Sequence, residues 1–75
     1  MKKYYIEFKH VNSNDEMYDM QSRWFDTEEQ AIEWFKQFDY ISSSDVYLMS
    51  GDWNETEDFY IDIKCERRLS LWDLI

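Results

Sequence analysis

The chain is poor in the residues that most often mark reactive chemistry or unusual backbone. Its 75 residues include one glycine, one histidine, one cysteine and no proline. A single cysteine, Cys65, excludes an internal disulfide and a zinc site built from several cysteines, and it fits a reducing compartment. One glycine is also too few for a glycine-rich phosphate-binding loop.

Long apolar runs are missing as well. The N-terminus lacks the apolar run of about 7–15 residues that a signal peptide needs. No segment approaches the about 20 apolar residues of a membrane span. We therefore expect a cytoplasmic protein with no membrane partner.

Positive charge is scarce in the middle of the chain. Between Asp15 and Asp62 there are 14 carboxylates and only two cations, Arg23 and Lys36, and the whole chain has a net charge of −9. Nucleic acids and anionic membranes bind basic patches, so direct nucleic-acid binding is not expected. The charge favours a basic protein as partner through long-range attraction. The alternative is that it serves solubility alone.

Aromatic residues, at 20% of the chain, oppose the disorder that such acidity would otherwise indicate. Each ring buries about 150–250 Å², which helps a chain this short to form a core. We predict a single domain at residues 1–68, followed by an apolar tail at 69–75. The tail, with Trp72, either closes the edge of the core or docks into a groove of a partner.

The first half of the chain predicts a hairpin and a helix. Apolar side chains alternate over residues 3–11 and again over 17–25, which is typical of two antiparallel strands. Thr27 to Gln30 matches a capping box, and apolar residues then recur at helical spacing, so we expect a helix at 27–38.

The second half predicts another hairpin. We expect a short strand at 46–49 that ends near Gly51, an acidic turn at 52–58, and a strand from 59 to 65. The order β-β-α-β-β predicts an α+β fold in which one helix covers one face of a four-stranded antiparallel sheet. The residues of the last strand expected in the core are Phe59, Ile61, Ile63 and Cys65. Those expected on the wet face are Tyr5, Glu7, Asp19, Tyr47, Tyr60 and Asp62.

Catalytic and metal-binding patterns are weak. Nucleophilic catalysis would need His10 beside a nucleophile and an orienting group, and no motif surrounds His10 or Cys65. Alternate residues Asp52, Asn54, Thr56 and Asp58 resemble the start of a calcium loop. However, Glu57 and Ile63 occupy the positions where that loop requires glycine and glutamate. We expect no enzyme activity, no cofactor and no metal.

The remaining pattern combines carboxylates with aromatic residues. Arginine and lysine side chains that grip phosphate also grip carboxylate, so spaced carboxylates can stand in for a nucleic-acid backbone. Trp53 would supply a desolvated anchor, unless it folds back over the core and leaves the acids merely solvated. The predicted partner-binding residues are Glu28, Glu29, Glu33, Asp52, Trp53, Glu55, Glu57 and Asp58.

In size, charge and layout the chain resembles the small acidic inhibitors encoded by phages and mobile elements, including anti-restriction and anti-CRISPR proteins. Some of these occupy the nucleic-acid channel of host nucleases, repair enzymes or repressors. The resemblance implies a non-catalytic inhibitor that occupies the nucleic-acid site of a basic protein, and it transfers no individual residue. The alternative is an adaptor or assembly module that binds through its sheet face, an edge strand or the Trp72 tail. An open edge and an aromatic outer face also favour a homodimer.

Overall fold

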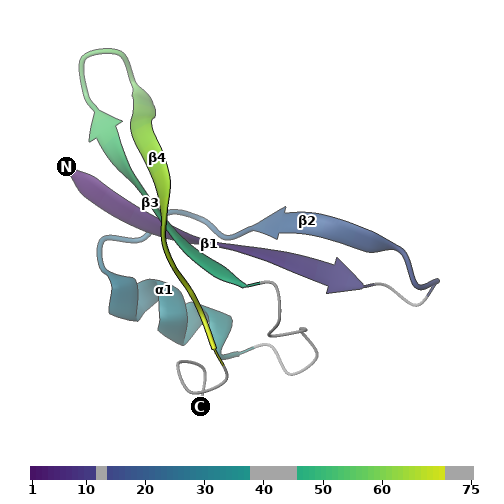
Figure 1. The fold of residues 1–75 in the computed structure, drawn as a ribbon. Coiled ribbons are helices and arrows are strands. Elements are labelled where there is room, and N and C mark those ends of the chain that lie inside the picture. The colour runs from purple at the N-terminus through teal and green to yellow at the C-terminus, as the bar shows by residue number, and fades with distance from the viewer. Residues whose placement is uncertain (12–13, 38–45, 71–75) are drawn as a thin grey trace.

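The computed structural model describes residues 1–11, 14–37 and 46–70. Its elements are β1 (Lys2–Val11), β2 (Met17–Gln21), α1 (Glu28–Phe35), β3 (Tyr47–Asn54) and β4 (Phe59–Arg68). The strands form one antiparallel sheet in the order β2-β1-β3-β4, and α1 packs on one face of it, against β1 (Figure 1). The predicted α+β fold, with element order β-β-α-β-β, is confirmed. No helix in the described ranges is long and apolar enough to cross a membrane.

Strand β1 is shared between two hairpins that point in different directions. Its residues 2–7 pair with β3 and its residues 7–11 pair with β2, so the two strand pairings share only Glu7. The β1–β2 and β3–β4 hairpins therefore project as two arms from a centre covered by α1 (Figure 1). We call residues 50–64, the outer part of the second hairpin, the β3–β4 arm.

The core lies between α1 and the centre of the sheet. It combines side chains from two strands, the helix and three positions outside these elements: Ile6, Phe8, Phe25, Ala31, Phe35, Val46, Leu48 and Leu69. Leu69, the first residue of the predicted tail, is fully buried, and its N–H donates to the carbonyl oxygen of Val46 at 2.8 Å. Residues 71–75 of that tail, including Trp72, lie outside the described residues.

The helix begins where the sequence predicts. Thr27 is the N-cap, and its Oγ1 accepts a hydrogen bond from the N–H of Gln30 at 3.2 Å. The return bond differs from a capping box, because the Gln30 side chain accepts from the N–H of Asp26 at 3.1 Å rather than from that of Thr27. The helix ends at Phe35, and residues 36 and 37 form a turn. The predicted end at residue 38 falls outside the described residues.

The third strand is longer than predicted. It continues through Gly51 to Asn54, and the turn is confined to residues 55–58. The Asn54 side chain explains this boundary, since its Oδ1 accepts from the N–H groups of Thr56 and Glu57 at 3.0 and 3.2 Å. Such local bonding by asparagine favours a turn. Asp58 completes it with φ of 61°, a left-handed conformation that aspartate tolerates.

The second predicted strand is interrupted by a bulge. Regular pairing stops at Ser22, whose Oγ accepts from the N–H of Ile6 at 2.8 Å, and it resumes where Phe25 pairs with Tyr4. Two residues thus stand opposite one residue of β1, which defines a bulge. The bulge turns Trp24 toward the face of the sheet that α1 does not cover.

The predicted core face of β4 was wrong. Phe59 and Ile63 are 43% and 52% exposed, and Cys65 is exposed too. The eight residues of α1 extend only about 12 Å, so the helix cannot reach along the β3–β4 arm. Strand β4 also contains register shifts, and Asp62 within it has φ of 53°. Alternation identifies a strand, but the elements packed around it decide which face is buried.

Candidate functional site

Five of the predicted partner-binding residues lie together on the β3–β4 arm: Asp52, Trp53, Glu55, Glu57 and Asp58. The three carboxylates of the turn, Glu55, Glu57 and Asp58, are exposed. Across the described ranges none of these three pairs with a cation, whereas Asp52 lies 3.9 Å from the N-terminal ammonium group. The end of the arm therefore presents unneutralised negative charge.

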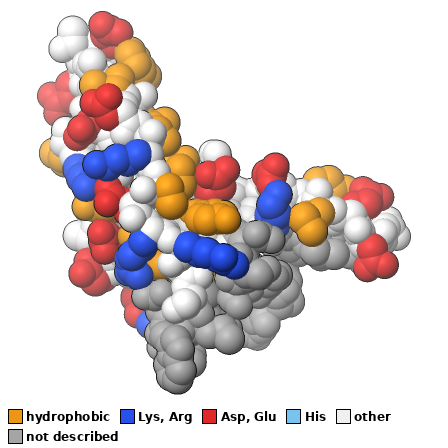
Figure 2. Space-filling view, in the orientation of Figure 1, with side chains coloured by type: hydrophobic (Ala, Val, Ile, Leu, Met, Phe, Trp, Pro, Cys, Tyr) orange, Lys and Arg blue, Asp and Glu red, His pale blue; other side chains and the backbone are white. Residues whose placement is uncertain are grey.

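The other three predicted residues, Glu28, Glu29 and Glu33, lie on α1, away from the end of the β3–β4 arm (Figure 1). Glu33 forms an ion pair with Lys36 at 3.2 Å. Figure 2 shows acidic side chains along both arms, with lysine and arginine side chains between them at the centre. The predicted site thus consists of two separate groups, one on the arm and one on the helix.

A cluster of stacked rings covers the sheet face opposite α1. We call it the aromatic face, and it consists of Tyr5, Trp24, Trp53 and Tyr60. The indole of Trp24 stacks on the ring of Tyr60, with centroids 3.6 Å apart and an interplanar angle of 6°. Trp24 also packs on Tyr5 at 4.5 Å, and Trp53 packs on Tyr60 at 4.9 Å. The cluster joins β1, the bulge, β3 and β4 across the sheet.

Gly51 makes this arrangement possible. A Cβ atom at this position would lie 2.9 Å from Cη2 of Trp24 and 3.2 Å from Cγ1 of Ile63. The bare backbone of β3 therefore gives the indole room to lie flat against Tyr60. A glycine inside a strand often marks such a close approach, and this was the one sequence signal for the role of Trp24.

Two residues that were predicted to face water, Tyr5 and Tyr60, are covered within the aromatic face. Tyr5, predicted to face water, is only 5% exposed because Trp24 covers it. Tyr60 is half-buried between Trp24 and Trp53. Trp53 itself packs on Tyr60, on the face opposite the main core, and remains half-exposed. It is therefore neither fully free nor folded over that core.

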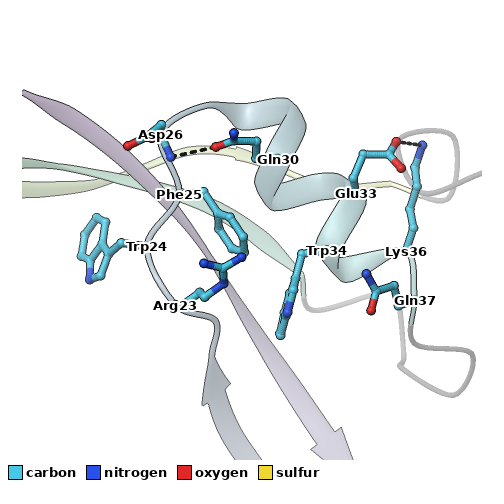
Figure 3. Close-up of a pocket in the computed structure, with 9 residues that line it drawn as sticks. All are labelled: Arg23, Trp24, Phe25, Asp26, Gln30, Glu33, Trp34, Lys36 and Gln37. Carbon is cyan, nitrogen blue, oxygen red and sulfur yellow. Dashed lines mark hydrogen bonds and ion pairs between the residues drawn. The ribbon is translucent and has the colours of Figure 1, made fainter.

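A cavity of about 670 Å³ lies between the bulge and α1 (Figure 3). Its apolar floor comes from Phe25 and Trp34, while Trp24 points away from the helix. The charged groups at its rim already have partners: the Arg23 guanidinium lies 4.6 Å from the Phe25 ring centroid, Glu33 pairs with Lys36, and Asp26 pairs with Lys3. Within the described residues, no cluster of three His, Cys, Asp or Glu side chains could hold a metal ion.

A polar network fixes the start of β1 to the β3–β4 hairpin. The hydroxyl of buried Ser50 donates to Oε1 of Glu66 at 2.6 Å, and Nζ of Lys2 lies 2.8 Å from the same oxygen. The hydrogen bond from Lys2 is the main cause that lowers the pKa of Glu66 below its ordinary value of 4.5, followed by the bond from Ser50. The bond to Glu66 in turn raises the pKa of Lys2.

This network predicts a pH-dependent contribution to stability. A carboxyl group with a lowered pKa in the folded state stabilises the fold above its unfolded pKa, and that contribution is lost as the pH falls through the folded value. The difference in unfolding free energy between wild type and Glu66→Gln should be largest above about pH 5 and should shrink toward low pH. Urea denaturation at a series of pH values measures it. Ser50→Ala removes one of the two hydrogen bonds to Glu66, so the contribution of Glu66 to the unfolding free energy should then depend less on pH. A difference for Glu66→Gln that does not change with pH would contradict the prediction.

Comparison of the chain with protein-family models, with characterised proteins and with solved structures gives no match. Function must therefore be argued from the surfaces themselves. The acidic end of the β3–β4 arm lies on the same hairpin as Trp53 and Tyr60 of the aromatic face, and together they form the candidate functional site.

Proposed function

We propose that this protein is a non-catalytic inhibitor that places its β3–β4 arm in the nucleic-acid site of a basic protein. The observation that supports this function best is the group of unpaired, exposed carboxylates Glu55, Glu57 and Asp58 at the end of a projecting hairpin. A groove lined with arginine and lysine for phosphate also binds carboxylates. Some of the phage-encoded acidic inhibitors that the chain resembles act in this way.

The turn supports this function by holding its charges in place. Asn54 accepts two backbone hydrogen bonds within the turn, and the N–H of Asp58 donates to the Asn54 carbonyl at 2.8 Å. A turn fixed in this way has less conformational entropy to lose when it binds. The net charge of −9 adds long-range attraction to a basic partner, which raises the association rate.

The helix group has a structural explanation of its own. Glu28 and Glu29 lie in the first turn of α1, where the helix dipole favours negative charge. Glu33 is paired with Lys36. We therefore assign direct contact with the partner to the arm, and to the helix group only a contribution to the overall field.

An affinity capture with three baits tests this proposal. The baits are wild type, an arm variant (Glu55→Gln, Glu57→Gln, Asp58→Asn) and a helix variant (Glu28→Gln, Glu29→Gln, Glu33→Gln) with the same change in charge. Wild type and the helix variant should retain a nucleic-acid-binding protein that moderate salt releases and added duplex DNA or RNA displaces. The arm variant should retain little of it. A captured protein that binds the arm variant equally well, or that duplex does not displace, would refute the proposal.

A second candidate function is an adaptor that binds through the open sheet face. The observation in its favour is the exposure of Phe59 and Ile63 on edge strand β4, since exposed apolar groups on an edge favour association. Binding of this kind should resist salt and be lost in Ile63→Ser while surviving in the arm variant. Homodimerisation through an edge strand stays a prediction.

A further inference from the structure

The aromatic face ends, toward the tip of the arm, in rings that no cation covers. Trp53 and Tyr60 remain half-exposed, and in the described part of the chain no lysine or arginine lies over either ring. Elsewhere the protein covers such a ring itself, as where the Arg23 guanidinium lies 4.6 Å from the Phe25 ring centroid. Trp53 and Tyr60 are each one residue inside the strand ends that the acidic turn at 55–58 connects.

We infer that this part of the aromatic face is a docking surface for an arginine side chain of the basic partner. The inference rests on the proposed function and deepens it by naming the group that the arm recognises. The guanidinium would stack on the half-exposed ring of Trp53, which packs on Tyr60, and pair with a carboxylate of the arm. The carboxylates of the arm favour a positively charged side chain, and the rings favour arginine over lysine.

Arginine satisfies both parts of this surface better than lysine does. Its guanidinium is planar, is weakly hydrated, stacks on aromatic faces and binds carboxylates in bidentate fashion. The lysine ammonium is compact and strongly hydrated, so moving it onto half-buried rings costs more desolvation. Bidentate binding to carboxylates also favours arginine, so the contribution of the rings is the part of the preference that is lost when Trp53 is replaced.

The rings are also held ready for such a contact. Trp24 lies between Tyr5 and the backbone of Gly51 and stacks on Tyr60 at 3.6 Å, so one side of Tyr60 is fixed. Tyr60 in turn supports Trp53, which pairs with it across β3 and β4. A surface ordered before binding loses little entropy when a partner arrives.

Peptides of nine arginines and nine lysines, which have equal charge, test the inference by calorimetric titration at low salt. Wild type should bind the arginine peptide about 3- to 10-fold more tightly, the range expected for cation–π contacts. Trp53→Leu keeps an apolar side chain on Tyr60 but removes the π face, so the preference for arginine should fall to the part that bidentate binding to carboxylates supplies. Trp53→Phe should retain part of the preference. Tyr18→Leu, at an exposed aromatic residue on β2, should leave it unchanged.

The outcomes separate this inference from the proposed function. Equal binding of the two peptides to wild type would overturn the arginine surface. The inhibitor proposal would survive if the arm variant still weakened both peptides. No binding of either peptide at low salt would overturn both proposals. A preference for arginine that persists in folded Trp53→Leu and Trp53→Phe without loss would overturn the role of Trp53.

Discussion

Replacing Trp24 with alanine should lower the free energy of unfolding by about 2–4 kcal/mol, somewhat less than for a fully buried aromatic residue. The substitution removes the stack on Tyr60 and uncovers Tyr5, which is 5% exposed in the native protein. Urea denaturation followed by far-UV circular dichroism measures the loss. Tyr18→Ala, at an exposed aromatic residue, is the matched control and should cost at most about 0.5 kcal/mol.

A double-mutant cycle with Gly51→Ala tests the cause of that loss. The added Cβ would lie 2.9 Å from Cη2 of Trp24, so in wild type the substitution should cost about 1–3 kcal/mol by overpacking. In the Trp24→Ala background the contact with Trp24 is gone and only the Ile63 side chain, 3.2 Å away, must move, so alanine should be close to neutral. Additive effects of the two substitutions would mean that Gly51 and Trp24 do not depend on each other.

The parts of the fold that local patterns predict are those set by neighbouring residues. Thr27 predicts the start of the helix because its side chain accepts a hydrogen bond from the backbone N–H three residues later. The alternation of Ile6 and Phe8 correctly marks the buried face of β1, because α1 lies directly over that strand. Both features follow from periodicity and capping alone.

The parts that the sequence does not predict depend on distant residues. The bulge that redirects Trp24 is fixed by a hydrogen bond between Ser22 and Ile6, 16 positions apart. The exposure of Ile63 depends on how β4 pairs with β3, because the register shift between Ser50 and Asp52 leaves Ile63 beside Gly51 and Trp24, on the face that α1 does not cover. A pattern within one strand cannot report either relation, and so Tyr5, predicted to face water, is buried while Ile63, predicted to be buried, is exposed.

The candidate site divides in the same way. Its acidic residues can be read from the chain, and the spacing of Glu33 and Lys36 on a helix already indicates an internal ion pair. The separation of the helix group from the arm depends on how α1 and the hairpin are oriented, which the order of elements does not specify. The aromatic face brings together rings from four segments, and only Gly51 hints at it before the fold is known.

Substitutions at Leu48 on β3 and at Ile63 on β4 should differ most in the unfolding free energy that they cost. Leu48→Ala should cost about 3–4 kcal/mol, because Leu48 is fully buried under α1 and truncation leaves a cavity. Ile63→Ser should cost about 1 kcal/mol or less, since half of that side chain is already in water. Thermal and urea unfolding of both variants measures the difference. Equal losses of unfolding free energy would mean that the Ile63 side chain is buried in solution, contrary to its exposure in the structure.

The same substitution separates the two candidate functions, because Ile63→Ser should remain folded at ordinary temperatures. An inhibitor that acts through the charged arm should retain its partner when Ile63 becomes polar, and its binding should still weaken steeply with salt. An adaptor that acts through the sheet face should lose its partner instead, while the variant in which Glu55, Glu57 and Asp58 are neutralised keeps it. Ile63 and the acidic turn lie on the same hairpin, so binding by that hairpin alone does not distinguish the two functions. Comparison of Ile63→Ser with the arm variant shows whether the partner binds the apolar side chain or the carboxylates.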